Sequence, residues 1–386
     1  MTTHTMKVYA LVFAVLLGGT GMPEIQWVGE RNLSRPDLGY PVLENKLTRE
    51  IYHATPETGT YSHHGYIAVF RGDLFAIWSN HSRDEDAPGQ RVLMSRSGDP
   101  GKSWTDFTEI FPPRDEVEPR SEEDPNDRSM IANGFAVADD SLYAVAEVFL
   151  RARDRKGLGR LARKVGPGDE LGPIFWLHDS PAEPVEGFPE YPAADDPRFK
   201  SVATKINEYL AQPEHLPSWK YRGENQSRIT APDGQRLCEP TEAWRMPNGT
   251  QVRMWRVKGK PRCNYASFSG VEGRTWYGPI KTEFPDTHSR SCAGNLPNGT
   301  AYVINNPGIG RDPLVISLAE NGLTFDRHAV IACDAPPMRH KGRSKGRGFQ
   351  YPHAEVAGDH LFVVYSVNKE DMQVTRIPIK ALYEVD

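Results

Sequence analysis

The sequence predicts an all-β fold, and its composition and a repeated hairpin pattern support that prediction. The 386 residues include 34 Gly, 32 Pro, 15 Tyr and 15 Phe, a mixture typical of short strands joined by turns. A short strand, a tight turn rich in Gly, Asn or Asp, and an alternating apolar strand recur at residues 66–79, 135–148, 243–257, 293–305 and 354–367. Turn chemistry and a period of two residues predict a β-hairpin in each copy.

The spacing of these hairpins predicts how they assemble. Successive turns are separated by about 50 to 70 residues, except for one gap about twice as long. Hairpins repeated at such intervals can bury their faces by closing radially into blades around a channel. We therefore predict a β-propeller of six or seven blades, with seven preferred, because the long gap could hold a further blade.

A second repeat is in phase with the hairpins. Residues Ser97 to Trp104 have the form S-x-D-x-G-x-[ST]-W, called an Asp box. In this turn the Asp and Ser side chains bind backbone donors, and the Trp packs beneath the hairpin. Ser269 to Trp276 keeps the frame with Val271 at the Asp position, and Gly322 to Phe325 retains only its end. We assign these boxes a structural role.

Two segments stand outside the repeat. Residues from about 167 to 230 are rich in Pro, and Val202, Ile206 and Leu210 fall four apart, which predicts a partly helical insertion over one face. At the N-terminus, Lys7 precedes an apolar run that ends at Leu17 and small residues follow, which predicts a signal peptide over residues 1–21. We expect residues 22–386 to form a single propeller domain of a secreted or periplasmic protein without membrane insertion.

Charge limits the partners. The formal net charge is −5, so no overall positive field attracts nucleic acid, and we expect no nucleic-acid partner. Five cations nevertheless crowd one short Gly-rich stretch, which is either a solvated loop or a cradle for an anionic ligand. They are Arg339, Lys341, Arg343, Lys345 and Arg347.

The four cysteines are Cys238, Cys263, Cys292 and Cys333. In an exported protein they can form disulfides, with three possible pairings, or remain buried thiols. The close C-x-x-C spacing of a zinc knuckle is missing, so a structural zinc site is a minor alternative.

Three motifs resemble a known group of proteins. Tyr61 to His64, Gln350 to His353, and Tyr365 to Asp371 resemble the sialidase-like propellers of bacterial polysaccharide-degrading systems. Within that group the chain resembles the rhamnosyl-glucuronate lyases, formerly described as rhamnosidases, and more loosely the ulvan lyases. The resemblance implies a carbohydrate-active enzyme whose partner is an acidic polysaccharide or oligosaccharide.

Sialidases themselves carry an Arg-Ile-Pro motif in the first blade, where the Arg binds the sialic-acid carboxylate. Here Arg376 to Pro378 stands near the C-terminus instead. The sialidase Tyr nucleophile and Arg trio cannot be placed on this sequence either. The sequence therefore ranks a sialidase below a lyase.

For the lyases, the resemblance implies one essential histidine at the start of an early blade, and His64 is the matching residue with His63 beside it. Elimination across C4 and C5 of a glucuronate needs a base for the C5 proton and an acid for the leaving oxygen. Histidine can serve as either, and Tyr can take the complementary role. The catalytic candidates are His64, His63, Tyr351 and His353.

The same step builds negative charge on the sugar carboxylate, which a cation must neutralise. Arginine suits a carboxylate because its planar fork binds both oxygens, and a calcium ion is an alternative; no cofactor is required. The substrate-binding candidates are Arg83, Arg91, Arg153, Arg290, Asn80, His81, Lys345 and Trp244, with Arg151 as a further arginine. Glu239 and Glu242 could supply an acid.

Three functions stay open on the sequence. The first is a polysaccharide lyase that cleaves a glucuronate-containing glycan by β-elimination. The second is a glycoside hydrolase of the sialidase or rhamnosidase type, which needs a pair of carboxyl groups or a Tyr nucleophile. The third is a non-catalytic propeller that binds glycan.

Overall fold

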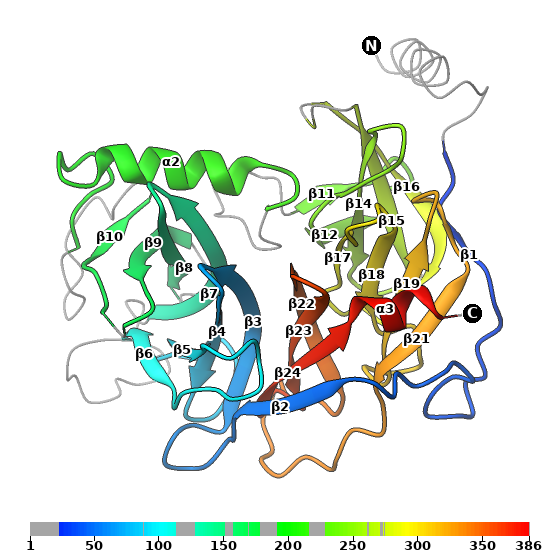
Figure 1. Ribbon diagram of the computed structural model, residues 1–386, viewed down its shortest axis with the longest axis horizontal. Helices are drawn as coiled ribbons and strands as arrows, with labels where there is room; N and C mark the ends of the chain where they lie inside the picture. Colours follow the sequence, from blue (N-terminus) through cyan, green and yellow to red (C-terminus); the bar gives the residue numbers. More distant parts are fainter. Residues whose placement is uncertain are drawn as a thin grey trace.

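The computed structural model describes residues 23–385 except 88, 113–127, 151–156, 169, 178–190, 216–227, 261, 271–272 and 274. Within these residues the protein is built from antiparallel sheets arranged around a central axis (Figure 1). The predicted signal peptide over residues 1–21 lies outside the described residues. No helix in the described part of the chain is long and apolar enough to cross a bilayer.

The first two sheets have four strands each. The first blade contains β3 (Tyr61–Phe70), β4 (Asp73–His81), β5 (Arg91–Ser97) and β6 (Thr108–Phe111). The second blade contains β7 (Arg128–Ala138), β8 (Ser141–Leu150), β9 (Gly157–Val165) and β10 (Ile174–Trp176).

The third blade is a larger sheet of β11 (Arg228–Thr230), β12 (Arg236–Pro240), β13 (Trp244–Arg245), β14 (Gln251–Val257), β15 (Cys263–Ser269) and β16 (Trp276–Pro285). The fourth contains β17 (Cys292–Asn295), β18 (Ala301–Asn305), β19 (Leu314–Ala319) and β21 (Arg327–Ala332). A short parallel pair, β1 (Gln26–Trp27) with β20 (Thr324–Phe325), lies beside it.

The fifth blade joins the two ends of the described chain. It contains β22 (Phe349–Ala357), β23 (His360–Val367), β24 (Asp371–Pro378) and the early strand β2 (Leu47–Tyr52). β2 pairs antiparallel with β24, and the hydroxyl groups of Thr48 and Thr375 bond across this pair at 2.9 Å. This pairing gives the ring a non-local closure.

The all-β propeller is confirmed, but the predicted blade number is wrong. The described residues form five blades rather than six or seven. The long gap between two predicted hairpins contains β9, β10, the helix α2 (Lys200–Ala211), β11 and β12, which extend neighbouring blades instead of forming another. The five predicted hairpins are β3–β4, β7–β8, β13–β14, β17–β18 and β22–β23.

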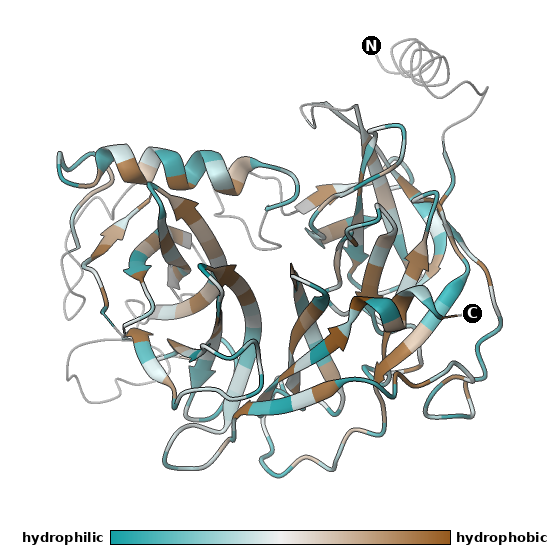
Figure 2. Ribbon diagram, viewed as in Figure 1, coloured by the Kyte–Doolittle hydropathy of each residue, from teal (hydrophilic) through white to brown (hydrophobic). Residues whose placement is uncertain are grey.

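Apolar side chains form several buried clusters within and between the blades. One cluster joins the first two blades through Phe75, Phe111, Met130 and Trp176, all 2% exposed or less. Full burial of such a side chain contributes roughly 1.5–3 kcal/mol. Figure 2 shows the apolar residues concentrated along the strands, with polar residues on the connecting loops.

The predicted helix is confirmed as α2, which lies across the end of the second blade in Figure 1. Ala203, Ile206 and Leu210 are buried against that blade, whereas Val202 is only partly buried. The short helix α3 (Ile379–Tyr383) follows the fifth blade.

The first Asp box satisfies its own backbone. Asp99 accepts hydrogen bonds from the backbone N–H of Lys102 at 3.1 Å and of Ser103 at 2.9 Å, and from the hydroxyl of Ser103 at 2.7 Å. These bonds lower the pKa of the Asp99 carboxyl. Trp104 packs partly buried against the first blade.

The cysteines form no disulfide with one another. Three of them are buried and Cys333 is half-buried. Of the alternatives left open by the sequence, the structure has thiols.

Candidate functional site

β-bulges interrupt one strand in each of four blades. The register shifts between His63 and Tyr66 in β3, and similar shifts occur in β7, β12 and β22. A bulge inserts an unpaired residue and re-aims its side chain. In three of these bulges a non-Gly residue has positive φ: His64 at 53°, Glu239 at 49° and Tyr351 at 52°. Such backbone conformations are uncommon and mark functional sites when the surrounding structure holds them.

The structure brings three of the predicted catalytic residues together. The ring of His63 lies 4.6 Å from that of His64 and 4.0 Å from that of Tyr351, measured between centroids. The rings of His64 and Tyr351 are 5.4 Å apart. All three side chains are buried. Nδ1 of His63 is fixed by the hydroxyl of Ser366 at 2.7 Å.

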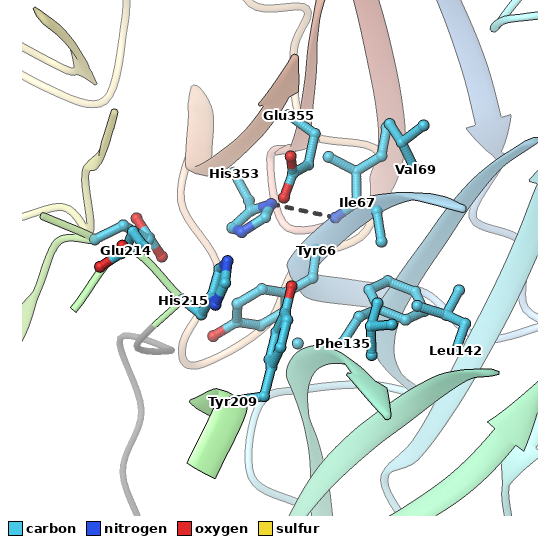
Figure 3. Close-up of a pocket in the computed structure, with 14 residues that line it drawn as sticks. Tyr66, Ile67, Val69, Phe135, Leu142, Tyr209, Glu214, His215, His353 and Glu355 are labelled. Carbon is cyan, nitrogen blue, oxygen red and sulfur yellow. Dashed lines mark hydrogen bonds between the residues drawn. The ribbon is translucent and has the colours of Figure 1, made fainter. Parts of the chain in front are cut away.

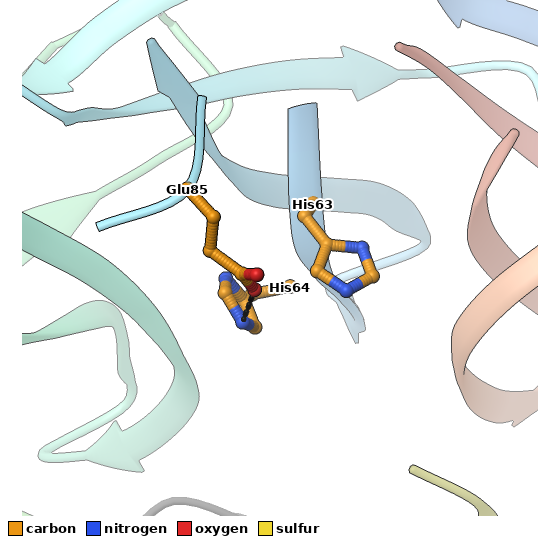
Figure 4. A group of neighbouring side chains, drawn as sticks. All are labelled: His63, His64 and Glu85. Carbon is orange, nitrogen blue, oxygen red and sulfur yellow. Dashed lines mark ion pairs between the residues drawn. The ribbon is translucent and has the colours of Figure 1, made fainter. Parts of the chain in front are cut away.

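Glu85, which the sequence did not single out, completes one side of this group (Figure 4). Its Oε1 lies 3.4 Å from Nε2 of His64, and its Oε2 accepts a hydrogen bond from Nζ of Lys369 at 2.5 Å. Burial, reinforced by the charge of Lys369, lowers the pKa of both His63 and His64 well below 6.5. Both imidazoles are therefore neutral at neutral pH.

On the other side, Tyr351 belongs to a chain of charged groups. Nη1 of Arg256 donates one hydrogen bond to the Tyr351 hydroxyl at 2.7 Å and another to a carboxylate oxygen of Glu239. The guanidinium carbons of Arg256 and Arg311 lie 5.6 and 5.4 Å from the centre of the Tyr351 ring. Burial raises the pKa of the Tyr351 phenol, and Arg256 opposes that rise. We call His63, His64, Glu85, Lys369, Tyr351, Arg256, Glu239 and Arg311 the channel site.

Arg290 lies completely buried between the channel site and a second cavity. Its guanidinium carbon is 4.4 Å from the centre of the Tyr66 ring, and its Nη2 is 4.0 Å from Oε1 of Glu242. The charge of Arg290 lowers the pKa of His63 and His64 on one side and of His353 on the other.

A second cavity has two adjoining lobes of about 160 and 340 Å³. Figure 3 shows the smaller lobe, which Tyr209 near the end of α2 helps to line. Both lobes are lined by the same group, which is Glu214, His215, Glu242, His353 and Glu355. Burial raises the pKa of Glu355 to about 7, with a contribution from Glu242, whose own pKa is also raised by burial. Burial lowers the pKa of His353 to about 3.

Residues two apart in a regular strand share a face, so the sequence places the candidate His353 beside Tyr351, but His353 does not join the channel site. The bulge between Gln350 and His353 breaks the alternation that this expectation assumed. Tyr351 contacts His63, whereas His353 accepts a hydrogen bond from the backbone N–H of Ile67 at 3.3 Å and lines the second cavity.

Two predicted substrate-binding residues have structural partners instead. Asn80 is buried and donates to the Tyr61 carbonyl at 3.0 Å. Arg91 pairs with Glu109 at 2.7 Å and donates to Oδ1 of Asn80 at 2.9 Å. Both hold the first blade together.

Trp244 is fully buried and donates to the carbonyl of Gly322 at 2.9 Å, which makes it part of the core. His81 accepts the backbone N–H of Arg83 at 3.1 Å, and the side chain of Arg83 is exposed. Lys345 donates to the carbonyl of Thr60 at 2.5 Å. Arg151 and Arg153 lie outside the described residues.

The sequence reasoning missed Glu85, Arg256 and Arg311. It did not use Lys369 as a site residue, and it offered Glu239 only as a possible acid. A positional signal existed for part of this set. His64, Glu239 and Tyr351 each stand shortly before the turn of their hairpin, at the same stage of the blade repeat. Glu85 and Lys369 come from loops, which no strand pattern locates.

The ligand atoms of His63, His64 and Glu85 lie within 4.8 Å of one another and could hold a metal ion. Two imidazoles and one carboxylate are not the oxygen ligands that calcium takes. Lys369 and Arg290 also place positive charge beside both histidines. The channel site therefore does not fit the calcium ion considered as a neutraliser, and its arginines fit that role better.

Comparison with known proteins gives two family models that overlap along the chain. Residues 204–364 match the BNR repeat-like domain, and residues 45–231 match the BT_1020-like N-terminal β-propeller. No curated protein matches the chain.

Among solved structures, the fold is similar to one described as a sialidase, with a TM-score of 0.74 and 23% identity over 92% of this chain. It is also similar to Trypanosoma rangeli sialidase in complex with sialic acid, with a TM-score of 0.55 and 14% identity over 89% of this chain. Streptococcus pneumoniae NanB sialidase gives a TM-score of 0.53 and 10% identity over 86%. The chain covers 35%, 60% and 71% of these three proteins, respectively.

Proposed function

Because the chain belongs to the sialidase-like superfamily of BNR-repeat propellers, we propose that it is a glycoside hydrolase that releases a carboxylated sugar from a glycan. One observation is the main support. A single nitrogen of Arg256 contacts both the hydroxyl of Tyr351 and the carboxylate of Glu239, and the side chains of Tyr351 and Glu239 are buried. A phenol, a base and a cation are thus gathered at one point.

In this proposal Tyr351 is the nucleophile. A carboxylate nucleophile would be repelled by the carboxylate of the sugar, whereas a neutral phenol would not, and Tyr is a known nucleophile in glycoside cleavage. The Tyr351 oxygen bonds to the anomeric carbon as the glycosidic C–O bond breaks, and its proton passes to Glu239. The leaving oxygen takes a proton from the ammonium group of Lys369, relayed through Glu85 and the imidazole of His64. Water then attacks the anomeric carbon and breaks the Tyr–sugar bond. The proton lost by the water returns to Lys369 through the same groups, and Glu239 returns its proton to Tyr351.

The arginines bind the sugar carboxylate. Arg256 and Arg311 both face the Tyr351 ring, so a sugar attacked by that phenol would lie within reach of both guanidinium groups. A guanidinium fork binds two carboxylate oxygens, which orients the sugar as well as neutralising it. The neighbouring solved structures whose titles name sialic acid or sialidase inhibitors support an acidic sugar as ligand.

A lyase is the second candidate, and the protonation states of His64 and Tyr351 are compatible with it. The lowered pKa of His64 leaves a neutral imidazole that can accept the C5 proton of a glucuronate. The raised pKa of Tyr351 keeps a phenol that can protonate the leaving oxygen. The same arginines would stabilise the charge that develops on the carboxylate. The sequence of residues 1–21 supports export to the periplasm or the medium in either case.

The product separates these reactions. The full chain is incubated with fluorogenic sialic-acid and glucuronic-acid glycosides and with a panel of acidic polysaccharides, including rhamnosyl-glucuronate glycans and ulvan. Hydrolysis releases reducing sugar without ultraviolet absorbance from an unsaturated uronate, whereas elimination produces that absorbance. Unsaturated product from every cleaved substrate would overturn the hydrolase proposal. If no substrate of the panel is cleaved but a glycan of the panel binds, a non-catalytic propeller would be favoured.

Variants test the roles. We expect Tyr351→Phe to lower kcat by about 10³-fold or more, because the nucleophilic oxygen is lost. Tyr265→Phe is the matched control, since it removes a hydroxyl that bonds Asp233 at 2.6 Å outside the channel site. A fluorinated sugar should trap a covalent adduct on Tyr351, detectable by mass spectrometry. His64→Ala should lower kcat by about 10²–10⁴-fold in either mechanism; near-wild-type turnover would remove His64 from the reaction.

A further inference from the structure

The cationic stretch noted in the sequence forms a surface loop, residues 339–347, called the basic loop from here on. Lys341, Arg343 and Arg347 are exposed. The side chain of Arg339 is partly exposed, and its guanidinium group already forms an ion pair with Asp371. The proposed reaction uses none of these residues.

Carboxylates hold this loop by its backbone, and two of its five cationic side chains, Lys341 and Arg343, have no partner among the described residues. Asp84 accepts the backbone N–H groups of Arg343 and of Ser344, the latter at 3.0 Å. Glu370 accepts the backbone N–H of Arg339 at 3.1 Å and that of His340 at 2.6 Å. These bonds order the loop through its backbone and occupy neither the side chain of Lys341 nor that of Arg343.

Three cations on or next to this loop are exposed, namely Arg83, Lys341 and Arg343. Within the described residues, the side chains of Lys341 and Arg343 have no hydrogen bond or ion pair to another group. The same holds for Arg83, which directly precedes the Asp84 that anchors the loop. Positive charge gathered on a fixed backbone attracts anions and costs little further ordering when one binds.

The basic loop borders the channel site. Asp84 bonds the loop, and the next residue, Glu85, contacts His64. Likewise Glu370 bonds the loop, and the preceding residue, Lys369, donates to Glu85. Two short segments thus tie the loop to the channel site, next to Glu85, whose side chain is 18% exposed.

We propose that the basic loop and Arg83 bind a second anionic group of the glycan, beyond the sugar that is cleaved. The preferred substrate is then an oligosaccharide or polysaccharide with repeated carboxylate or sulfate groups, rather than a glycan with one acidic terminal sugar. This inference rests on the proposed function for its catalytic consequence.

The test compares a long and a short substrate. The variant is Arg83→Gln/Lys341→Gln/Arg343→Gln. For an acidic oligosaccharide we expect KM to rise about tenfold, since each exposed ion pair contributes a few-fold, with kcat unchanged. For the fluorogenic monosaccharide glycoside, KM and kcat should stay at wild-type values. Salt at about 0.5 M should abolish the difference between wild type and variant on the long substrate.

The control variant is Lys164→Gln/Lys200→Gln/Lys380→Gln, which removes three exposed positive charges on β9, α2 and α3. It should leave KM unchanged for both substrates. An equal rise in KM for the short and long substrates, or an equal effect of the control variant, would overturn the inference.

A binding measurement tests the anionic subsite independently of the proposed reaction. The inactive Tyr351→Phe chain is titrated with oligomers of glucuronic acid and with the same oligomers after carboxyl reduction. We expect the acidic oligomer to bind about tenfold more weakly when the three basic-loop changes are added. If no substrate is cleaved but this difference appears, the proposed reaction fails and the anionic subsite stands. If cleavage occurs without this difference, the subsite is wrong.

Discussion

The raised pKa of Glu355 predicts how the folding stability of the protein changes with pH. It lines both lobes of the second cavity, where burial and then the charge of Glu242 raise its pKa from 4.5 to about 7. The folded protein therefore binds this proton more tightly than the unfolded chain does. Stability is unaffected below the unfolded pKa and decreases as pH rises from about 4.5 through about 7. Glu355→Gln, which mimics the protonated acid, removes that loss.

The magnitude follows from the size of the shift. A difference of about 2.5 pKa units corresponds to about 3 kcal/mol, at about 1.4 kcal/mol per unit. Because Glu355 is only partly buried, we reduce this to about 1–2 kcal/mol. In a protein of this length, 1 kcal/mol shifts Tm by about 1–2 °C. Glu355→Gln should therefore raise Tm by about 2–3 °C at about pH 8.5 and change it little at about pH 5.

Differential scanning calorimetry at the two pH values measures this effect. Glu320→Gln is the control, because that carboxylate is 78% exposed and should give no pH-dependent change. A Tm for Glu355→Gln that is unchanged or lower at the alkaline pH, or raised equally at both, would refute the reasoning. It would mean that the cavity carboxyl is ionised in the folded protein at little free-energy cost.

Two further predictions concern the scaffold. Asp99→Ala removes the acceptor of the backbone N–H groups of Lys102 and Ser103, so it should lower Tm and leave the kinetic constants unchanged. An altered kcat would contradict a purely structural Asp box. Because the cysteines form no disulfide, a reductant should leave Tm unchanged, and thiol titration in denaturant should find all four thiols per chain. A lower thiol count would show a disulfide that the structure lacks.

The parts of the channel site that sequence reasoning located share one property. His64 and Tyr351 stand in strands whose hairpin partners lie within a few residues, so turn chemistry alone places them at the inner edge of a blade. Glu85 and Lys369 meet only because the fifth blade packs beside the first. No local pattern encodes that contact.

By itself, the sequence determined the local elements. The period of two, the Gly- and Asn-containing turns and the fourfold spacing of Val202, Ile206 and Leu210 depend on near neighbours, and so they predicted the hairpins and α2 correctly. The tertiary structure alone decided the number of blades, because β2 must pair with β24 across the whole chain to close the ring. It also decided which side chains meet, because a bulge shifts the strand register and moves His353 away from Tyr351.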